Sequence, residues 1–418
     1  MNRALVALAA MLTALAVCIP GAFARVDSRS APMATPGVTK TSITIGGTFP
    51  LSGPASLYAP IPRGMEAYFK WVNNRKGPDG KKGIYGRQIV WKYYDDGYNP
   101  AQTVQLTNKL VLEDKIFADV GSLGTEHNQA IRPMLNQRKI PQILVATGAS
   151  YWGLQYKQFP WTIGWQPDYI AEGRAYGTWI RKNAPNSKIA VFYQNDDYGK
   201  DYLRGLKIGL AGKRSLIVSE QSYEITDANY GSQIARQKAS GADTWVLLTT
   251  PTPTVRAIGT AKALNWKPDT LVINSVSAID TVMAAATRSA GSDFIAGAVS
   301  SAYLKSATDP KYANDAIMRQ YRSILSRYGP SGADPNNSFY YYGMAKAYDI
   351  VKVLSGMKTI TRPALMRAVL HMNWTNPWTI KGVKVKTSPS DHFPISQIKL
   401  IRYTDGHFRE FGALIRGR

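Results

Sequence analysis

The stretch KIAVFYQNDDYGKDYLRGL, residues 188–206, places a short apolar run directly before an acidic turn and an amphipathic segment. The run has the length and the β-branched and aromatic residues of a buried strand, and LRGLKIGLAG has the spacing of a helix that Gly212 ends. The aspartates between them can satisfy the free N–H groups of the helix N-terminus. A strand that turns into a helix in this way is the repeating unit of a parallel α/β sheet.

The same alternation extends through most of the chain. Before residue 188, strands are predicted in SITIGGTFP, RQIVWKYYDD, IFADVGS and IPQILVA, with helices in PRGMEAYFKWVNN, after Asn99-Pro100, in HNQAIRPML and in AEGRAYGTWIRKN. After the stretch 188–206, strands are predicted in SLIVSEQSY, TWVLLTT and DTLVIN, and helices are predicted in SQIARQKAS and TVRAIGTAKAL. The remainder is mostly helical and ends in a strand pair around Asp405-Gly406. Two α/β halves and a helical return segment predict two lobes joined by several crossings.

The first 24 residues have the features of a secretory signal. Arg3 precedes an apolar run, and the small-residue ending AFA predicts cleavage after Ala24 and export to the periplasm. The run is shorter than the roughly 20 residues that a membrane helix needs. A lipoprotein signal would have a small residue before Cys18, where Val17 stands.

The composition limits the kinds of site and partner that the sequence predicts. Cys18 is the only cysteine, so a chain cleaved after Ala24 would have no disulfide and no thiolate site. The roughly 394 residues left by that cleavage correspond to two or three globular units, each of about 150 residues. The net charge of +23 comes from scattered basic residues without a nucleic-acid-binding motif. We therefore expect a solvated basic surface, no nucleic-acid partner, and a monomer.

Motifs for catalysis or metal binding are missing from the sequence. YQNDDYGKDY lacks the EF-hand order, and adjacent acids cannot face each other across a glycosidic bond. Ser150 lacks the glycine of a nucleophile elbow, and Lys207 stands where a P-loop before Gly212-Lys213 would need glycine. The histidines lack metal-ligand spacing. We expect no enzyme activity, no metal and no cofactor.

Six fragments, taken in order, resemble one known family. They are ITIGGTFPLSGPAS, KGIYGRQIVWKYYDDGYNPAQTVQLTNKLV, IFADVGSLGTEHNQAI, IPQILVATGAS, KIAVFYQNDDYGKDYLRGL and SFYYYGMAKAYD. Together they resemble the branched-chain-amino-acid-type periplasmic substrate-binding proteins of ABC transporters. The resemblance implies a type I periplasmic binding fold, an α/β fold with two Rossmann-like lobes, parallel-rich central sheets, a three-segment hinge and a cleft between the lobes. The implied lobes are residues 40–163 with 298–392, and 164–297 with 393–414.

The implied function is capture of a small-molecule ligand by hinge closure, followed by docking on ABC permease subunits in the membrane. A receptor that reports to a membrane sensor would use the same clamp, so that alternative stays open.

The resemblance also points to residues in the first lobe. Ser52 follows the first predicted strand on the implied cleft floor, although a serine there can equally cap a helix. Thr125 matches the position that donates to a ligand carboxylate from its side chain and backbone N–H, with an ordinary N-cap as the alternative. Ala146 and Gly148 match contact positions that let the backbone approach a ligand, and Thr147 lies between them.

Further candidates are Tyr198, which the resemblance implies covers the ligand on closure, and His127, which could donate to a ligand oxygen or be a solvated residue. Trp152 and Phe339 are aromatic residues near the implied cleft, suited to stacking on a ring or to ordinary core packing.

One departure from the family concerns the ligand. Amino-acid binders hold the ammonium group with an acid of the second lobe, but in LVINSVSAID Val276 stands near that position and Asp280 comes later. Ser275 in this stretch is a further candidate ligand contact. An unpaired ammonium group would lose roughly 1.5–3 kcal/mol. We therefore expect an aromatic or short aliphatic acid in preference to an α-amino acid, with an amino acid or amide as the alternative.

Overall fold

A computed structural model describes residues 35–77 and 79–417. The predicted signal segment, residues 1–24, lies outside the described residues. Within these ranges, no helix combines the length and the apolar character that crossing a membrane requires.

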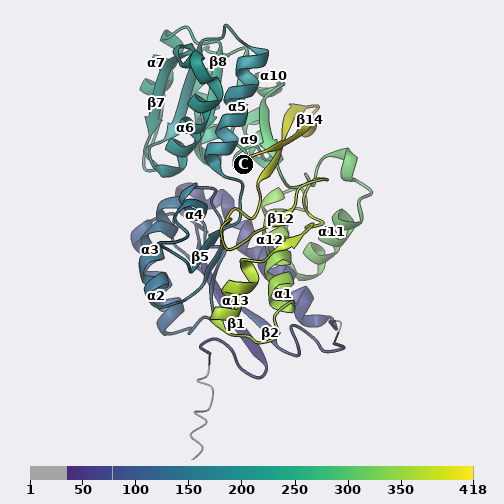
Figure 1. The fold of residues 1–418 in the computed structure, drawn as a ribbon. Helices are drawn as coiled ribbons and strands as arrows, with labels where there is room; N and C mark the ends of the chain where they lie inside the picture. Colours follow the sequence, from purple (N-terminus) through teal and green to yellow (C-terminus); the bar gives the residue numbers. More distant parts are fainter. Residues whose placement is uncertain (1–34, 78, 418) are drawn as a thin grey trace, which may run out of the picture. The chain divides into compact units, whose positions relative to one another are not determined.

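The first lobe is built on a parallel five-stranded sheet with the order β2-β1-β3-β4-β5 (Figure 1). Its strands are β1 (Ser42–Phe49), β2 (Gln88–Asp95), β3 (Asp119–Val120), β4 (Gln142–Val145) and β5 (Thr162–Gly164). Its early helices are η1 (Gly53–Tyr58), α1 (Pro60–Asn74), α2 (Pro100–Leu112), α3 (Thr125–Gln137) and α4 (Tyr151–Leu154). Later in the chain come η3 (Pro310–Tyr312), α11 (Ala316–Tyr328), α12 (Ser338–Ser355), α13 (Arg362–Val369) and the strand pair β11 (Asn373–Trp374) and β12 (Val385–Lys386). One apolar cluster joins β1 to α1, α11 and α12.

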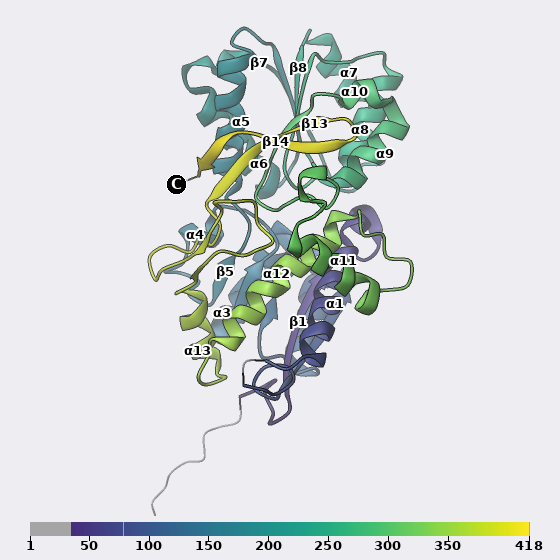
Figure 2. The same cartoon turned by 90° about the vertical axis from the view of Figure 1, so that its right-hand side faces the viewer.

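The second lobe is built on a seven-stranded sheet with the order β14-β13-β10-β9-β8-β6-β7 (Figure 2). Its strands are β6 (Ile189–Gln194), β7 (Ile217–Tyr223), β8 (Thr244–Leu248), β9 (Thr270–Ile273), β10 (Val299–Ala302), β13 (Gln397–Thr404) and β14 (His407–Arg416). Its helices are α5 (Tyr169–Asn183), α6 (Asp197–Leu210), η2 (Ala211–Leu216), α7 (Gly231–Ala239), α8 (Pro251–Ala263), α9 (Asp280–Ala290) and α10 (Ser292–Ile295). The strands from β7 to β10 are parallel, and the hairpin β13–β14 is added antiparallel at one edge.

Burial explains why β8 is a strand. Its five residues are all buried, and they alternate between two apolar clusters. Trp245 and Leu247 pack in one cluster, and Val246 and Leu248 pack in the other. This alternation is expected of a parallel strand that is covered by helices on both faces.

The chain passes between the two sheets three times, after β5, after β10 and before β13. The fold class predicted from the sequence is therefore confirmed. One boundary differs from the expectation, because residues 298–392 were assigned to the first lobe. The structure places β10 (Val299–Ala302) in the second sheet, where Val299 pairs with Val272 of β9, so this crossing comes after Ala302.

Helices α5 and α6 approach each other unusually closely because both carry glycines on the shared face. A Cβ built on Gly173 would lie 2.3 Å from the carbonyl oxygen of Tyr202, and one on Gly205 would lie 2.2 Å from that of Ile170. Such distances are far below van der Waals contact, so the spacing of the two helices depends on glycine at these positions.

Candidate functional site

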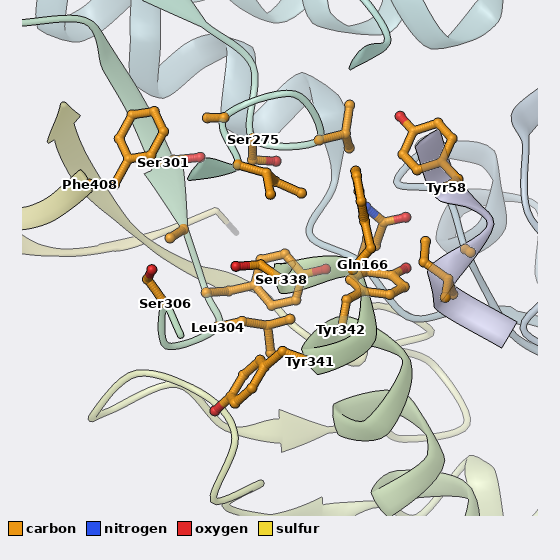
Figure 3. Close-up of a pocket in the computed structure, with 18 of the residues that line it drawn as sticks. Tyr58, Gln166, Ser275, Ser301, Leu304, Ser306, Ser338, Tyr341, Tyr342 and Phe408 are labelled. Carbon is orange, nitrogen blue, oxygen red and sulfur yellow. The ribbon is translucent and has the colours of Figure 1, made fainter. Parts of the chain in front are cut away.

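A cavity lies between the two lobes and encloses about 1110 Å³ between protein atoms, part of it continuous with solvent (Figure 3). Residues of both lobes and of two of the crossings contribute to its lining. Among the lining residues are Tyr58, Thr125, Thr147 and Phe339 of the first lobe, Tyr198, Ser275 and Phe408 of the second, and Gln166 and Tyr303 at the crossings.

One end of the cavity, which we call the threonine end, is formed by Gly124, Thr125, Ala146 and Thr147. Thr125 begins α3, and the preceding Gly124 has φ of 105° and adds no side-chain cap. The hydroxyl oxygens of Thr125 and Thr147 lie 2.6 Å apart, and either can donate to the other. This shared hydrogen bond uses one of the two hydroxyl hydrogens, and Thr147 also has a side-chain hydrogen-bond contact with Tyr169. Both threonine hydroxyls lie beside the positive end of α3. This arrangement suits an anionic oxygen.

Buried tyrosines form the wall beside the threonine end. Tyr58 and Tyr98 come from the first lobe, whereas Tyr169 and Tyr198 come from α5 and α6 of the second. The rings of Tyr169 and Tyr198 pack edge to face, 5.3 Å apart, and the side-chain amide of Asn274 donates to the Tyr198 hydroxyl. Burial raises the pKa of all four phenols above the ordinary value of 10.0. The wall is therefore aromatic and uncharged at neutral pH.

Glu172 on α5 supports the second-lobe side of the cavity from behind. Its carboxylate accepts from the Ser275 backbone N–H at 2.8 Å, from the Ser275 hydroxyl at 2.9 Å and from the Tyr202 hydroxyl at 3.0 Å. Tyr176 also donates to it. Burial raises the pKa of this carboxyl above its ordinary value. Glu172 thus positions the loop that carries Ser275 into the cavity lining. The sequence did not indicate this role of Glu172, because no pattern near α5 points to a loop so distant in the chain.

Asp280, Asp309 and Glu410 are the carboxylates of the cavity lining among the described residues, and each already has protein partners. Asp280 accepts from the Ser306 hydroxyl at 2.8 Å, from the Phe408 N–H at 3.2 Å and from the Thr308 hydroxyl. Asp309 caps η3, and Glu410 pairs with Lys311 at 2.9 Å and Lys399 at 3.3 Å. The lining acids are therefore engaged in holding the protein's own segments together.

Two hydrogen bonds connect α6 of the second lobe with the first lobe. The Asp197 N–H donates to the Glu126 carboxylate at 3.2 Å, and the Ser150 N–H donates to the Asp201 carboxylate at 2.8 Å. Burial raises the pKa of Asp201, and of Asp196 beside it, to about 6 each. The structure therefore has the two lobes in contact at the N-terminus of α6.

Six of the ten predicted ligand-binding residues line the cavity. They are Thr125, Ala146, Thr147, Tyr198, Ser275 and Phe339. Val276, which stands near the position of the family's ammonium-binding acid, also lines it. The residues of the first-lobe strand ends and of the loop after β9 are thus brought together from positions far apart in the chain.

The other four predicted residues lie outside the lining. Ser52 is exposed and belongs to a turn in which its backbone N–H donates to Asp95 at 3.1 Å. Gly148 packs against the first crossing, where a Cβ would lie 2.1 Å from the carbonyl oxygen of Pro167. His127 is buried with its ring 4.2 Å from that of Tyr98, and Trp152 is buried beneath the guanidinium of Arg132. Burial lowers the pKa of His127 to about 4, so it is uncharged at neutral pH.

The sequence did not indicate several residues of the lining. Tyr303, Leu304 and Ser306 follow β10, and Ile401 and Phe408 belong to the β13–β14 hairpin. Their neighbours in sequence carry no binding motif, so only the crossing of the chain between the lobes identifies them. The aromatic residues around Phe339 belong to SFYYYGMAKAYD, one of the fragments that carry the family resemblance, whereas no motif marked Gln166.

The protein thus has two lobes with a cavity between them, an arrangement that suits a binding protein. A family model described as periplasmic binding protein matches residues 42–407, and the chain belongs to that family. The predicted family is thereby confirmed.

The curated relatives that match are named as Leu/Ile/Val- or leucine-binding proteins. The chain is 24% identical over 203 residues to Leu/Ile/Val-binding protein homolog 3 of Brucella melitensis, a match that covers 48% of this chain and 52% of that protein. The chain thus spans about half the length of this curated relative. Two solved structures share the fold. One is a branched-chain amino acid ABC transporter protein from Thermus thermophilus with bound valine (TM-score 0.76, 19% identity, 91% of this chain and 97% of that chain). The other is a solute-binding protein from R. palustris in complex with 4-hydroxybenzoate (TM-score 0.72, 19% identity, 90% and 97%).

Proposed function

We propose that this protein is the periplasmic substrate-binding component of an ABC importer and that it captures a small carboxylate by closing its lobes around it. The observation that carries the proposal is the threonine end. There the paired hydroxyls of Thr125 and Thr147 lie at the N-terminus of α3, inside a cavity that both lobes line. Hydroxyl donors and the positive end of a helix both favour an anionic group.

The uncharged wall supports an aromatic or short aliphatic acid over an α-amino acid. An ammonium group needs a carboxylate acceptor, and losing a charged hydrogen bond costs roughly 1.5–3 kcal/mol. Asp280 and Glu410 are already held by protein donors, and Glu172 is turned toward the Ser275 loop. Tyrosine rings offer flat apolar surfaces that stack well on an aromatic acid.

An α-amino acid or amide is the second candidate, and one observation favours it. Asp280 lines the cavity, and the structure from Thermus thermophilus with the same fold has bound valine. Asp280 already accepts from the Ser306 and Thr308 hydroxyls at Oδ2 and from the Phe408 N–H at Oδ1, so an ammonium group would share it with these donors.

A thermal-shift panel on unfolded and refolded protein tests the ligand class. Benzoate, benzamide and benzylamine differ only in the charge and hydrogen bonding of one group, and butanoate, leucine and valine complete the panel. A ligand at 100 times its Kd stabilises the folded state by about 2.7 kcal/mol, so binders raise the Tm. We expect benzoate to raise it and benzamide and benzylamine to leave it unchanged. A rise with leucine or valine alone contradicts the proposal and favours Asp280 as the ammonium acceptor.

Thr125→Ala tests the placement of the carboxylate. Losing a hydrogen bond to a charged group should weaken binding of the acid about 10- to 100-fold, measured by titration calorimetry. Thr260→Ala on α8, outside the cavity lining, is the matched control and should leave affinity unchanged. Equal affinities for both variants would show that the carboxylate lies elsewhere. Export is tested separately, by sequencing the N-terminus of periplasmic protein, which is expected to begin at Arg25.

A further inference from the structure

The cavity extends well beyond the threonine end. On its other side lie Ala278, Ile279, Leu304, Ile401 and Phe408, which we call the far end. Figure 3 shows Phe408 and Leu304 on the side opposite Tyr58, with Gln166 and Tyr342 between them. Tyr58 belongs to the aromatic wall beside the threonine end, so the cavity is elongated from that wall toward the β13–β14 hairpin.

The far end is held in shape by its surroundings. Ile401 and Phe408 are buried in the apolar cluster of the second lobe, together with Met283 of α9. Asp280 accepts from the Phe408 N–H and from the Ser306 hydroxyl, so one carboxylate ties α9 to the hairpin and to the segment after β10. A wall anchored from three elements in this way is pre-formed, and a ligand would not have to order it.

The polar groups around the far end are already satisfied. The Ser301 hydroxyl lies 3.1 Å from that of Tyr176, and the Ser306 hydroxyl donates to Asp280 at 2.8 Å. The lining on this side also includes Lys305, which pairs with Asp315 at 2.8 Å, and Glu410, which pairs with Lys311 at 2.9 Å. Beside these engaged charges lie the apolar side chains of Ile279, Leu304 and Phe408. Apolar walls with engaged polar neighbours favour an apolar ligand group over a hydrated one.

We propose that the far end holds an apolar tail, and that the ligand is an amphipathic monocarboxylate whose body runs from the threonine end past Gln166 and Tyr342. This inference rests on the proposed function, because the threonine end must first hold the carboxylate. The ring or short chain of an acid of the proposed class lies beside the threonine end, and an apolar extension of it would also cover the far-end walls, whose contact with water is unfavourable.

Titration calorimetry with straight-chain monocarboxylates from butanoate to decanoate tests the inference. Each methylene that leaves water for an apolar site tightens the Kd about fourfold. We expect that gain at each step until the far end is filled, with one ligand bound per protein. If butanoate and decanoate bind equally, the far end takes no tail and the inference is overturned, while the carboxylate site stands. If no acid in the series binds, and benzoate does not bind either, the proposed function fails as well.

The variant Leu304→Asn distinguishes binding of the tail at the far end from non-specific adsorption of long-chain acids to the protein. Leu304 is partly buried at the far end, and an amide there should reduce the ratio of decanoate to butanoate affinity about tenfold or more. Leu112→Asn on α2 is the matched control, because Leu112 is 57% exposed and lies outside the lining. The control should keep the wild-type ratio. A ratio that is the same in both variants overturns the inference.

Discussion

Replacing Gly205 with alanine should push α5 and α6 apart and disturb both the fold and the ligand site. The new Cβ would lie 2.2 Å from the carbonyl oxygen of Ile170 and 2.9 Å from its carbonyl carbon. Both are backbone atoms, so no side chain can rotate away, and the helices must separate by about 1 Å to restore normal contact. Tyr169 begins α5 and Tyr198 lies in the first turn of α6, so this separation moves two tyrosines of the cavity wall.

The expected change in the free energy of unfolding of Gly205→Ala is the difference between two opposing effects. Overpacking a close contact costs typically 1–3 kcal/mol and more when backbone blocks relaxation. Alanine also has a higher helix propensity than glycine, which stabilises the helix by up to about 1 kcal/mol and offsets part of that cost. We expect Gly205→Ala to lower the free energy of unfolding by about 2 kcal/mol, and to weaken ligand binding. Gly212→Ala is the control, since nothing lies within 4 Å of a Cβ there, and it should be neutral or stabilising by about 0.4–1 kcal/mol.

Urea unfolding followed by circular dichroism measures the difference between the two variants. The midpoint for Gly205→Ala should fall with little change in slope, whereas the midpoint for Gly212→Ala should stay or rise. If both variants have the same stability, the spacing of α5 and α6 does not depend on Gly205 and the packing argument is wrong.

Two further predictions concern charge. Burial raises the pKa of Asp196 and Asp201 to about 6 from the ordinary 3.8, so the stability that they provide is fully present below about pH 4 and is lost as the pH rises through about 6. The Tm should therefore fall between about pH 4 and pH 6, and a smaller fall is expected in Asp201→Asn. An equal fall would assign the effect to other groups. Glu172→Gln replaces an acceptor oxygen with an NH₂ group that faces donors, and chemical unfolding should show a loss of about 1–3 kcal/mol. Ser275→Ala removes one of those donors and should cost less, so the reverse order would contradict the supporting role of Glu172.

The sequence by itself indicated most of the strands and helices and their order, because these depend on local chemistry, but it did not indicate β5, α9 or β10. Alternating apolar runs and amphipathic segments predicted the strands and helices, and Asn99 was expected to cap the helix that Pro100 opens. In the structure the Asn99 side chain accepts from the Ala101 N–H at 2.9 Å. The predicted turn at Asp405-Gly406 has positive φ at both residues, 53° and 81°, as a tight hairpin requires. The strand-end loops that carry Thr125, Thr147 and Tyr198 were also found this way, because parallel sheets gather such loops at one edge.

Only the tertiary structure decided which side chains face the cavity. His127 and Trp152 follow candidate loops closely, yet they turn into the core of the first lobe, because a helix points successive side chains in different directions. Glu172 supports Ser275, which is more than a hundred residues away in the chain, and no local pattern encodes that pairing. The far end forms where the segment after β10, which carries Leu304, meets the β13–β14 hairpin, which carries Ile401 and Phe408. Local sequence specifies backbone conformation, whereas a ligand site depends on distances between segments that only the packed chain sets.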